Sequence, residues 1–248
     1  LALAASDFCG NLITKKIKVP YVYRNTPENL ERLGEIINEF IAGLPISKEE
    51  ILQVCVNVAE RVNPFEGKAY NMFTFLENPL AEKLTELIQL PVCIENDTRS
   101  MAFAEFIKGR CKGMKDVIFV NMCWGLGIGI IIDGKLYYGK SGYSGEFGHM
   151  TAYNNNIICH CGKIGCIETE VSGRALKRRL TENIMAGKPS ILSDKVLNRK
   201  EELSLQDIMD AIAKEDVLSL ATLQHIADEL GKQLAGIINI FNPEMLVI

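Results

Sequence analysis

The sequence predicts an α/β protein with a mixed sheet and two lobes. Predicted strands come first in hairpins and then alternate with helices, which is the order expected when helices pack on a sheet. The chain has 248 residues, enough for one or two domains. Apolar residues make up 48% and charged residues 23%, and this ordinary composition excludes disordered, collagen-like and disulfide-dense chains.

The first half begins with a predicted hairpin over residues 1–25, with its turn at 7–11. Thr26 and Pro27 suit the N-cap and the first position of a helix, and apolar residues at three- and four-residue spacing continue it to Gly43. The other predicted elements are a strand at 51–58, a loop at 63–67, a helix at 79–90, a buried strand at 91–94 and a helix at 98–108.

The second half begins with a strand at 117–121 and a hairpin over 127–138, whose turn Asp133-Gly134 is a strong two-residue signal. A Gly-, Cys- and Asn-rich loop covers 139–166. Three predicted helices follow, at 172–186, 204–213 and 216–239. We place the lobe boundary near 110–116, which predicts an N-terminal lobe of residues 1–115 and a C-terminal lobe of residues 116–248.

Both ends of the chain look like the middle of a larger fold. Residues 1–5 and 245–248 are apolar runs typical of buried strands, so we expect further residues at each end. The net charge is −4 and basic residues form only short clusters, which argues against nucleic-acid binding by this stretch itself. No apolar run nears the ~20 residues of a membrane span, and no signal peptide is evident, so we expect a cytoplasmic protein without a membrane partner.

The cysteines fall into two groups. Five are scattered among apolar neighbours, and we expect them to be reduced, buried thiols: Cys9, Cys55, Cys93, Cys111 and Cys123. Cys159, Cys161 and Cys166 are closely spaced on a polar loop and follow His149. Three thiolates and one imidazole form the closed tetrahedral shell of structural zinc, so the sequence predicts a zinc loop over about 145–168. His160 could replace His149 as the fourth ligand, and free thiols are the alternative.

Three other motifs have a structural and a functional interpretation. The glycine-rich stretch 125–129 could bring backbone N–H groups of Gly125 and Gly127 to a phosphate, or allow a tight strand crossing. Asp97 could cap a helix, or face a cleft as a carboxylate that binds or deprotonates a hydroxyl. If a metal holds the loop, Glu146, His149 and Glu168 converge, and such groups suit a polyhydroxylated ligand.

Taken together, these motifs resemble the ROK family of bacterial sugar kinases and sugar-responsive transcriptional repressors. The matching segments are Glu95-Asn96-Asp97, the 125–134 hairpin, Gly145-Glu146-Phe147-Gly148-His149, Cys159-x-Cys161-Gly162-x-x-Gly165-Cys166-x-Glu168 and Asn242-Pro243-Glu244. The resemblance runs over essentially the whole chain. It implies a two-lobed ribonuclease-H-like fold (the sugar kinase/actin/Hsp70 fold), truncated at both ends.

The resemblance also implies roles for the matched positions. Asn96, Asp97, Glu146, His149 and Glu168 would contact a small-molecule sugar. In a kinase, Asp97 would be the catalytic base that activates a sugar hydroxyl for attack on Mg-ATP. The zinc ligands would be His149, Cys159, Cys161 and Cys166, and the protein would be a homodimer or homotetramer.

One departure from the family pattern decides between its two branches. The kinases carry Gly-Thr-Gly where this chain has Cys123-Trp124-Gly125, so an indole should fill space that a nucleotide phosphate needs. Loss of nucleotide contacts with retention of sugar contacts is the pattern of the repressors, in which sugar binding between the lobes alters operator DNA affinity through a separate N-terminal domain. We therefore expect the sugar-binding effector domain of a transcriptional regulator. The alternatives are an ATP-dependent hexose or amino-sugar kinase and a zinc-stabilised interaction module.

Overall fold

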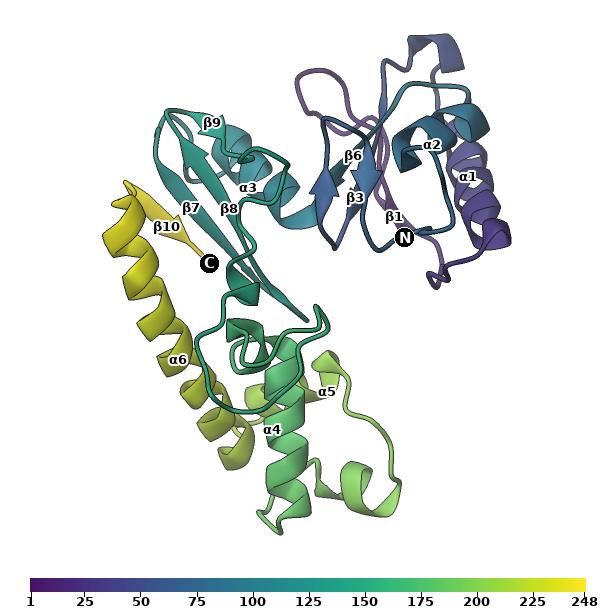
Figure 1. Cartoon of the computed structure of the whole chain (residues 1–248). Helices are drawn as coiled ribbons and strands as arrows, with labels where there is room; N and C mark the ends of the chain where they lie inside the picture. Colours follow the sequence, from purple (N-terminus) through teal and green to yellow (C-terminus); the bar gives the residue numbers. More distant parts are fainter. The chain divides into compact units, whose positions relative to one another are not determined.

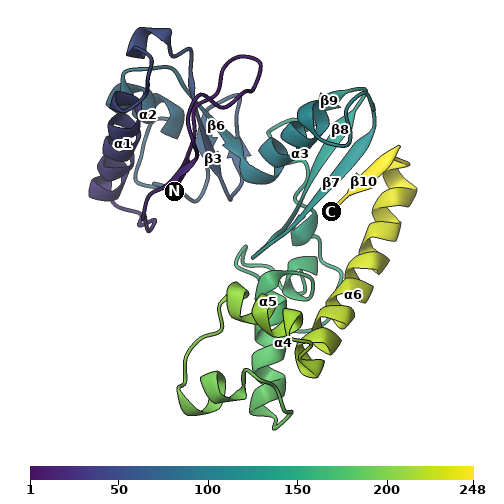
Figure 2. The ribbon, with the colours of Figure 1, turned by 180° about the vertical axis from the view of Figure 1, so that it is seen from behind.

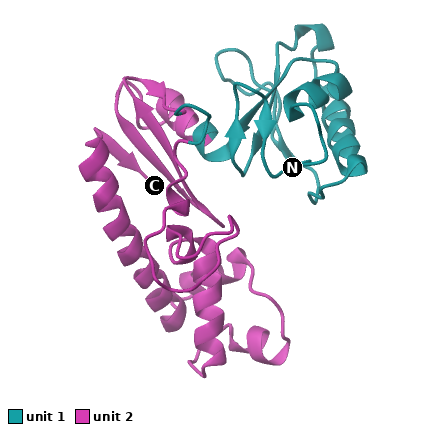
Figure 3. Cartoon of the chain, viewed as in Figure 1, with its two compact units in different colours: residues 1–100, 139–143 teal, residues 101–138, 144–248 magenta.

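The computed structural model describes all of residues 1–248, which form two compact units (Figure 3). Unit 1 comprises Leu1–Ser100 and Gly139–Tyr143, and unit 2 comprises Met101–Tyr138 and Ser144–Ile248. The division falls within helix α3 (Asp97–Lys108), before the boundary at 115 that the sequence suggested. The reason is packing: Phe106 of α3 lies against a cluster formed by Cys111, Val117 and Ile131.

Unit 1 contains three two-stranded sheets and the helices α1 and α2 (Figure 1). The predicted N-terminal hairpin is confirmed, although its strands are short. The elements of unit 1 are β1 (Ala2–Leu3), β2 (Ile17–Lys18), α1 (Pro27–Ala42), β3 (Val54–Val58), β4 (Val62–Asn63), β5 (Lys68–Ala69), α2 (Leu80–Ile88) and β6 (Val92–Asn96). Strands β1 and β2 pair antiparallel, β4 pairs antiparallel with β5, and β3 pairs parallel with β6.

The core of unit 1 follows from helical spacing and strand alternation. Thr26 accepts a hydrogen bond from the Asn29 N–H and Gly43 ends α1, so both predicted helix signals are confirmed. Apolar side chains of α1 and α2 pack with Val58 and Ile94 of the β3–β6 sheet in one cluster. Because side chains alternate along a strand, Cys55 falls on the opposite face of β3 and is exposed.

Unit 2 is built on a four-stranded mixed sheet in the order β10–β7–β8–β9. Its elements are β7 (Val117–Met122), β8 (Leu126–Ile132), β9 (Lys135–Leu136), α4 (Gly173–Met185), α5 (Leu205–Ala213), α6 (Val217–Phe241) and β10 (Met245–Val247). Asp133 and Gly134 have φ values of 51° and 73°, as a primed hairpin turn requires. The C-terminal apolar run is a strand, paired parallel with β7 and half-buried.

The core of unit 2 joins the sheet to its helices. Ile118 and Ile128 of the sheet, Leu180 of α4 and Ile226 of α6 belong to one buried cluster. Helices α4 and α6 lie side by side within this unit (Figures 1 and 2). No helix in the structure has the length and apolar character that crossing a membrane would need.

The five scattered cysteines are not all buried, so that expectation was wrong. Only Cys111 is buried and Cys93 is half-buried, while Cys9, Cys55 and Cys123 are exposed. Cys9 lies in the N-terminal hairpin turn and Cys123 in the turn between β7 and β8. Apolar neighbours in sequence do not bury a side chain at a turn or on the open face of a strand.

Candidate functional site

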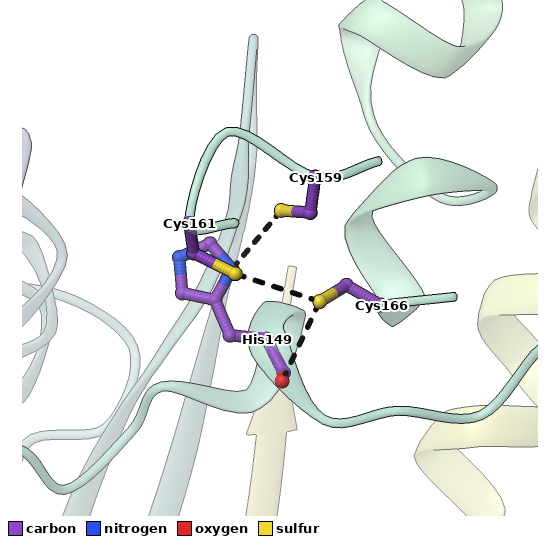
Figure 4. A group of neighbouring side chains, drawn as sticks. All are labelled: His149, Cys159, Cys161 and Cys166. Atoms are coloured by element: carbon purple, nitrogen blue, oxygen red, sulfur yellow. Dashed lines mark hydrogen bonds between the residues drawn. The ribbon is translucent and has the colours of Figure 1, made fainter. Parts of the chain in front are cut away.

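Four side chains of unit 2 gather at one point, as Figure 4 shows. The ligand atoms of His149, Cys159, Cys161 and Cys166 all lie within 4.8 Å of one another. His149 Nδ1 is 3.5 Å from Cys159 Sγ, and Cys161 Sγ is 3.6 Å from Cys166 Sγ. The sulfur separation far exceeds the ~2.05 Å of a disulfide bond, so these thiols are free.

The spacing of these atoms fits a tetrahedral metal ion. Bonds of about 2.3 Å to sulfur and about 2.0 Å to nitrogen give edges of about 3.8 Å between sulfurs and about 3.6 Å between sulfur and nitrogen. The two observed separations lie close to those edges. Three sulfurs and one imidazole nitrogen form a closed donor set, so the residues can hold a metal without an open position for catalysis.

Glycine and short-range hydrogen bonds shape the loop that carries the cluster. The Cys159 N–H donates to the Lys163 carbonyl, and the Gly162 N–H donates to the Cys159 carbonyl. Gly165 has φ of 72°, and a Cβ there would collide with the Tyr153 carbonyl oxygen. Only glycine satisfies both demands, so this position is needed to bring Cys161 and Cys166 together.

The loop is also anchored to two helices of unit 2. The Tyr153 hydroxyl donates to Glu229 of α6 at 2.9 Å. Glu170 accepts hydrogen bonds from Asn155 of the loop at 2.6 Å and from Arg179 Nε of α4 at 2.9 Å. The hydrogen bond from Asn155 and the charges of Arg178 and Arg179 outweigh burial and lower the pKa of Glu170. The loop therefore rests on a framework that the helices supply.

His149 presents different nitrogens to different partners. Its Nδ1 faces Cys159, while its Nε2 lies 3.7 Å from Glu146 Oε2. The segment that carries both residues approaches β8 closely: a Cβ on Gly148 would meet the Leu126 carbonyl oxygen. His149 can thus bind a metal with one nitrogen and act toward a ligand with the other, as its two ring nitrogens allow.

His160, the other candidate ligand, has different partners in the structure. Its Nδ1 lies 2.8 Å from Glu168 Oε1 and 3.7 Å from Cys159 Sγ. Its ring meets that of His149 edge to face, with centroids 5.0 Å apart. His149 lies with all three thiols in one group of possible ligand atoms, and His160 lies with Cys159 and Glu168 in a second. The edge-to-face contact of the two imidazoles brings His149 and Glu168 near one another. No sequence pattern pointed to the pairing of His160 with Glu168.

Glu168 is buried, with only 7% of its side chain exposed. Its Oε2 accepts a hydrogen bond from the Leu126 N–H at 2.9 Å, and its Oε1 faces Arg174 Nη1 at 3.3 Å as well as His160. A Cβ on Gly125 would lie 2.6 Å from Glu168 Oε2. Because Gly125 has no Cβ, it leaves room for the close approach of this carboxylate to the start of β8.

The turn between β7 and β8 is tied to the start of α4. The Gly173 N–H donates to the Cys123 carbonyl at 2.7 Å, and the Arg174 N–H donates to the Trp124 carbonyl at 3.3 Å. Ser172 Oγ accepts from the next N–H, that of Ala175. The first N–H groups of α4, which would otherwise be available to an anion, thus have protein partners. The geometry favours the tight-crossing interpretation of the glycine stretch, and a phosphate contact at Gly125 or Gly127 stays a prediction.

In unit 1, Asn96 and Asp97 stand where β6 meets α3. Asn96 Oδ1 accepts from the Arg99 N–H at 3.0 Å, and Asn96 Nδ2 donates to the Glu60 carbonyl at 3.0 Å. Asn96 is therefore the N-cap of α3, and the interpretation of Asp97 as the cap was wrong: Asp97 is the first residue of the helix. Burial raises the pKa of the Asp97 carboxyl, although hydrogen bonds from Thr98 oppose this.

Arg99 is a structural residue that the sequence did not reveal. Its residue exposure is 2%, and it forms a 2.7 Å ion pair with Glu95. It also donates to the carbonyl oxygens of Val62 and Gly142. These contacts join β4, β6 and residues 139–143 in unit 1, next to Asn96 and Asp97.

Comparison with known proteins supports one family over nearly the whole chain. The ROK family model matches residues 6–248. A glucokinase of Halalkalibacterium halodurans is 30% identical over 219 residues, which cover 87% of this chain and 66% of the relative. The xylose repressor of Bacillus subtilis is 29% identical over 245 residues, which cover 98% of this chain and 59% of the relative.

A solved structure extends the likeness to three dimensions. The crystal structure of a ROK family transcriptional regulator, a homologue of the Escherichia coli Mlc protein, matches with a TM-score of 0.78 and 30% identity. The match covers 99% of this chain and 61% of that one. This chain thus spans about three-fifths of the length of these relatives, with the predicted α/β fold. From the family match and the shared fold together, the chain belongs to the ROK family.

Proposed function

We propose that this chain is the sugar-binding effector domain of a ROK transcriptional regulator. Its sugar would be bound by Asn96 and Asp97 of unit 1 and by Glu146, His149 and Glu168 of unit 2. Carboxylates, an amide and an imidazole supply the donors and acceptors that several sugar hydroxyls need. Operator DNA would be bound by a domain outside residues 1–248, and sugar binding would change DNA affinity through a coupling of ~1–3 kcal/mol.

The residues of the β7–β8 turn favour a regulator over a kinase. At the position where the family's kinases have the Thr of a phosphate motif, this chain has Trp124, with 38% exposure. The carbonyls of Cys123 and Trp124 accept hydrogen bonds from the first two N–H groups of α4. An indole has no hydroxyl for a phosphate oxygen, and the turn has no spare helix N–H groups to offer one. The named repressor among the relatives supports the same choice.

We also propose that the metal held by the cluster is zinc. Three thiolates and one imidazole are the donor set of structural zinc sites, and soft sulfur ligands disfavour Mg²⁺ and Ca²⁺. The role of the metal would be to hold the loop that carries His149 and Glu168 in one conformation. The resemblance to the family supports a homodimer or homotetramer as the assembly.

A sugar kinase is the second candidate, and Asp97 favours it. A general base works best with a pKa closer to neutral pH than that of an exposed Asp, and burial raises the pKa of Asp97. The glucokinase among the relatives is as similar to this chain as the repressor. In this alternative, Mg-ATP is the phosphoryl donor and Asp97 activates the sugar hydroxyl.

One experiment on the full-length protein separates the two candidates. The protein is mixed with Mg-ATP and, in turn, with D-glucose, D-xylose, N-acetyl-D-glucosamine and N-acetyl-D-mannosamine, and ADP release and thermal unfolding are both measured. We expect no ADP release and a rise in Tm with one sugar, as selective binding to the folded state requires. Sugar-dependent turnover that is absent in Asp97→Asn would overturn the regulator proposal and establish the kinase.

A Trp124→Thr variant sharpens the result. If Trp124 is what excludes nucleotide, calorimetry on the full-length variant should detect ATP binding that the wild type lacks. No gain in ATP affinity would mean that Trp124 is not the obstacle, and the choice between regulator and kinase would then depend on the turnover assay. A sugar-dependent change in retention of operator DNA completes the assignment.

A further inference from the structure

Two cysteines of unit 1, which the proposed function does not use, are neighbours across a parallel strand pair. Cys55 of β3 and Cys93 of β6 are partners in register. Val54 of β3 and both Val92 and Ile94 of β6 lie in or against the apolar core of unit 1. Because side chains alternate along a strand, the two cysteines lie on the opposite face of the sheet. Cys55 is exposed there and Cys93 is half-buried.

The strand spacing suits a disulfide bond between these two residues. Adjacent strands lie about 4.8 Å apart, within the range of about 4.4–6.8 Å that separates the Cα atoms of disulfide-linked residues. Since both side chains leave the same face of the sheet, their Cβ atoms do not point apart. Both thiols are free in the structure. The register of β3 and β6 therefore holds a reduced thiol pair where one S–S bond can form with the strand pairing kept.

The two thiols differ in how readily they ionise. Cys55 Sγ donates a hydrogen bond to Asn57 Oδ1 at 3.7 Å, which favours the protonated thiol. The neighbouring Cys93 thiol and then burial raise the pKa of Cys55, whereas the neighbouring Cys55 thiol lowers the pKa of Cys93. Because the thiolate is the nucleophile, Cys93 is the thiol that attacks first and Cys55 the thiol that follows.

We propose that Cys55 and Cys93 form a thiol–disulfide exchange site that reacts with low-molecular-weight disulfides. The Cys93 thiolate attacks one sulfur of a small disulfide RS–SR, which forms a mixed disulfide and releases RS⁻. Cys55 then attacks the Cys93 sulfur, forms the Cys55–Cys93 bond and releases the second RS⁻. The two released thiolates take up the two thiol protons, so the protein dithiol is oxidised by two electrons and the small disulfide is reduced to two thiols.

The modification is reversible and lies beside a proposed sugar-binding segment. Exposed disulfides are the readily reduced ones, and Cys55 is exposed, so excess small thiol returns the pair to its reduced form. Strand β6, which carries Cys93, continues directly into Asn96 and Asp97. The inference itself does not depend on the proposed sugar-binding function, because it follows from the thiols and the strand register alone.

The test treats the fully reduced, full-length protein with oxidised glutathione at neutral pH. Remaining thiols are then blocked with iodoacetamide, and peptides are analysed by mass spectrometry without reduction. We expect a peptide pair linked through Cys55 and Cys93, and its loss on treatment with excess reduced glutathione. Cys9, an exposed thiol in the N-terminal hairpin turn, serves as the internal comparison and should carry a mixed disulfide with glutathione.

Single substitutions show whether both thiols are needed. Cys55→Ser and Cys93→Ser should each lose the linked peptide completely, and the cysteine that remains should carry a mixed disulfide with glutathione. Cys123→Ser removes an exposed thiol of unit 2 and should leave the yield of the linked peptide unchanged. Absence of the linked peptide in the folded wild type would overturn the proposal. An equal yield from protein unfolded in urea would also overturn it, because the strand register would then not be what pairs the thiols.

Discussion

Each unit brings thiols together, but by a different physical route. In unit 1, Cys55 and Cys93 are partners in the parallel register of β3 and β6, so backbone hydrogen bonds place them side by side. In unit 2, Cys159, Cys161 and Cys166 meet on a loop whose conformation depends on glycine and on helix anchors. A strand pair keeps its thiols close through backbone hydrogen bonds, whereas the proposed metal would hold the three thiols of the loop together.

The proposed sugar residues also lie on regular secondary structure in unit 1 and on irregular backbone in unit 2. Asn96 and Asp97 are held at a strand-to-helix junction, where Asn96 caps α3 and Arg99 ties three segments together. Glu146 and His149 lie on irregular backbone beside the cysteine cluster. The difference predicts that loss of metal disables unit 2 and spares unit 1, and that unit 1 depends instead on its buried Arg99.

Cys161→Ser should give the largest effect, and it tests the dependence of unit 2 on metal. Zinc content should fall sharply and Tm should drop by roughly 15 °C, since even part of the ~10–16 kcal/mol of a structural zinc site is large beside protein stability. Sugar affinity should fall although Cys161 contacts no sugar in the proposal. Cys123→Ser, an exposed thiol of the same unit, should change none of these quantities. Zinc lost with sugar affinity unchanged would refute the coupling.

Arg99→Leu tests the corresponding residue of unit 1. It leaves Glu95 without its 2.7 Å partner and removes the donor to the Val62 and Gly142 carbonyls, so the free energy of unfolding should fall by about 3 kcal/mol. Chemical denaturation measures this change, and metal content should remain normal. Arg32→Leu breaks only exposed ion pairs on α1 and should change stability by less than ~0.5 kcal/mol. Similar effects for both variants would reject the role of Arg99.

Cys55→Ala tests the strand-register pair through the reactivity of Cys93. The neighbouring Cys55 thiol lowers the pKa of Cys93, which favours its thiolate form. Without the Cys55 thiol the pKa of Cys93 should rise, and alkylation by iodoacetamide at pH 7 should slow several-fold, because the thiolate is the nucleophile. Mass spectrometry of Cys93 across pH 6–10 measures the shift. A pH profile of Cys93 identical to that of the wild type would show that register alone does not couple the thiols.

Asp97→Asn should give the smallest change in stability, and its sign is informative. Burial raises the pKa of folded Asp97, so the folded state holds the proton to higher pH than the unfolded state. The charge therefore opposes folding above that pKa, and Asn should raise Tm at pH 7 by about 1–2 °C. The gain should shrink as pH falls through the pKa of Asp97. Asp194→Asn is the opposite control, because Asn198 and Arg199 lower the pKa of that exposed carboxyl. A loss of Tm in Asp97→Asn would contradict the sign.

Sequence patterns predicted the features whose cause is local. Thr26, Pro27 and Gly43 mark a helix because capping involves residues within one turn. Asp133-Gly134 marks a hairpin because few residues tolerate its dihedral angles. The cluster of His149 with three cysteines was also predictable, since Cys159, Cys161 and Cys166 lie within eight residues of one another on a polar loop.

Features that depend on distant segments could not be predicted in this way. The Cys55–Cys93 pair requires the register of β3 and β6, and Arg99 requires the carbonyls of Val62 and Gly142. The bridge from His160 to Glu168 requires the fold of the loop, and the anchoring of Trp124 requires the start of α4. The scattered cysteines were misjudged for the same reason, because burial depends on which face is covered.

By itself, the sequence determined the α/β class, the limits of most helices and strands, the grouping of His149 with three cysteines and the family likeness. Each of these follows from dihedral preferences, hydrophobic periodicity or residue types at short spacing. Only the tertiary structure decided that Asn96 and not Asp97 caps α3, that α3 is shared between two units, and that His160 pairs with Glu168. Those outcomes depend on hydrogen bonds and packing between segments far apart in the chain, which no local pattern encodes.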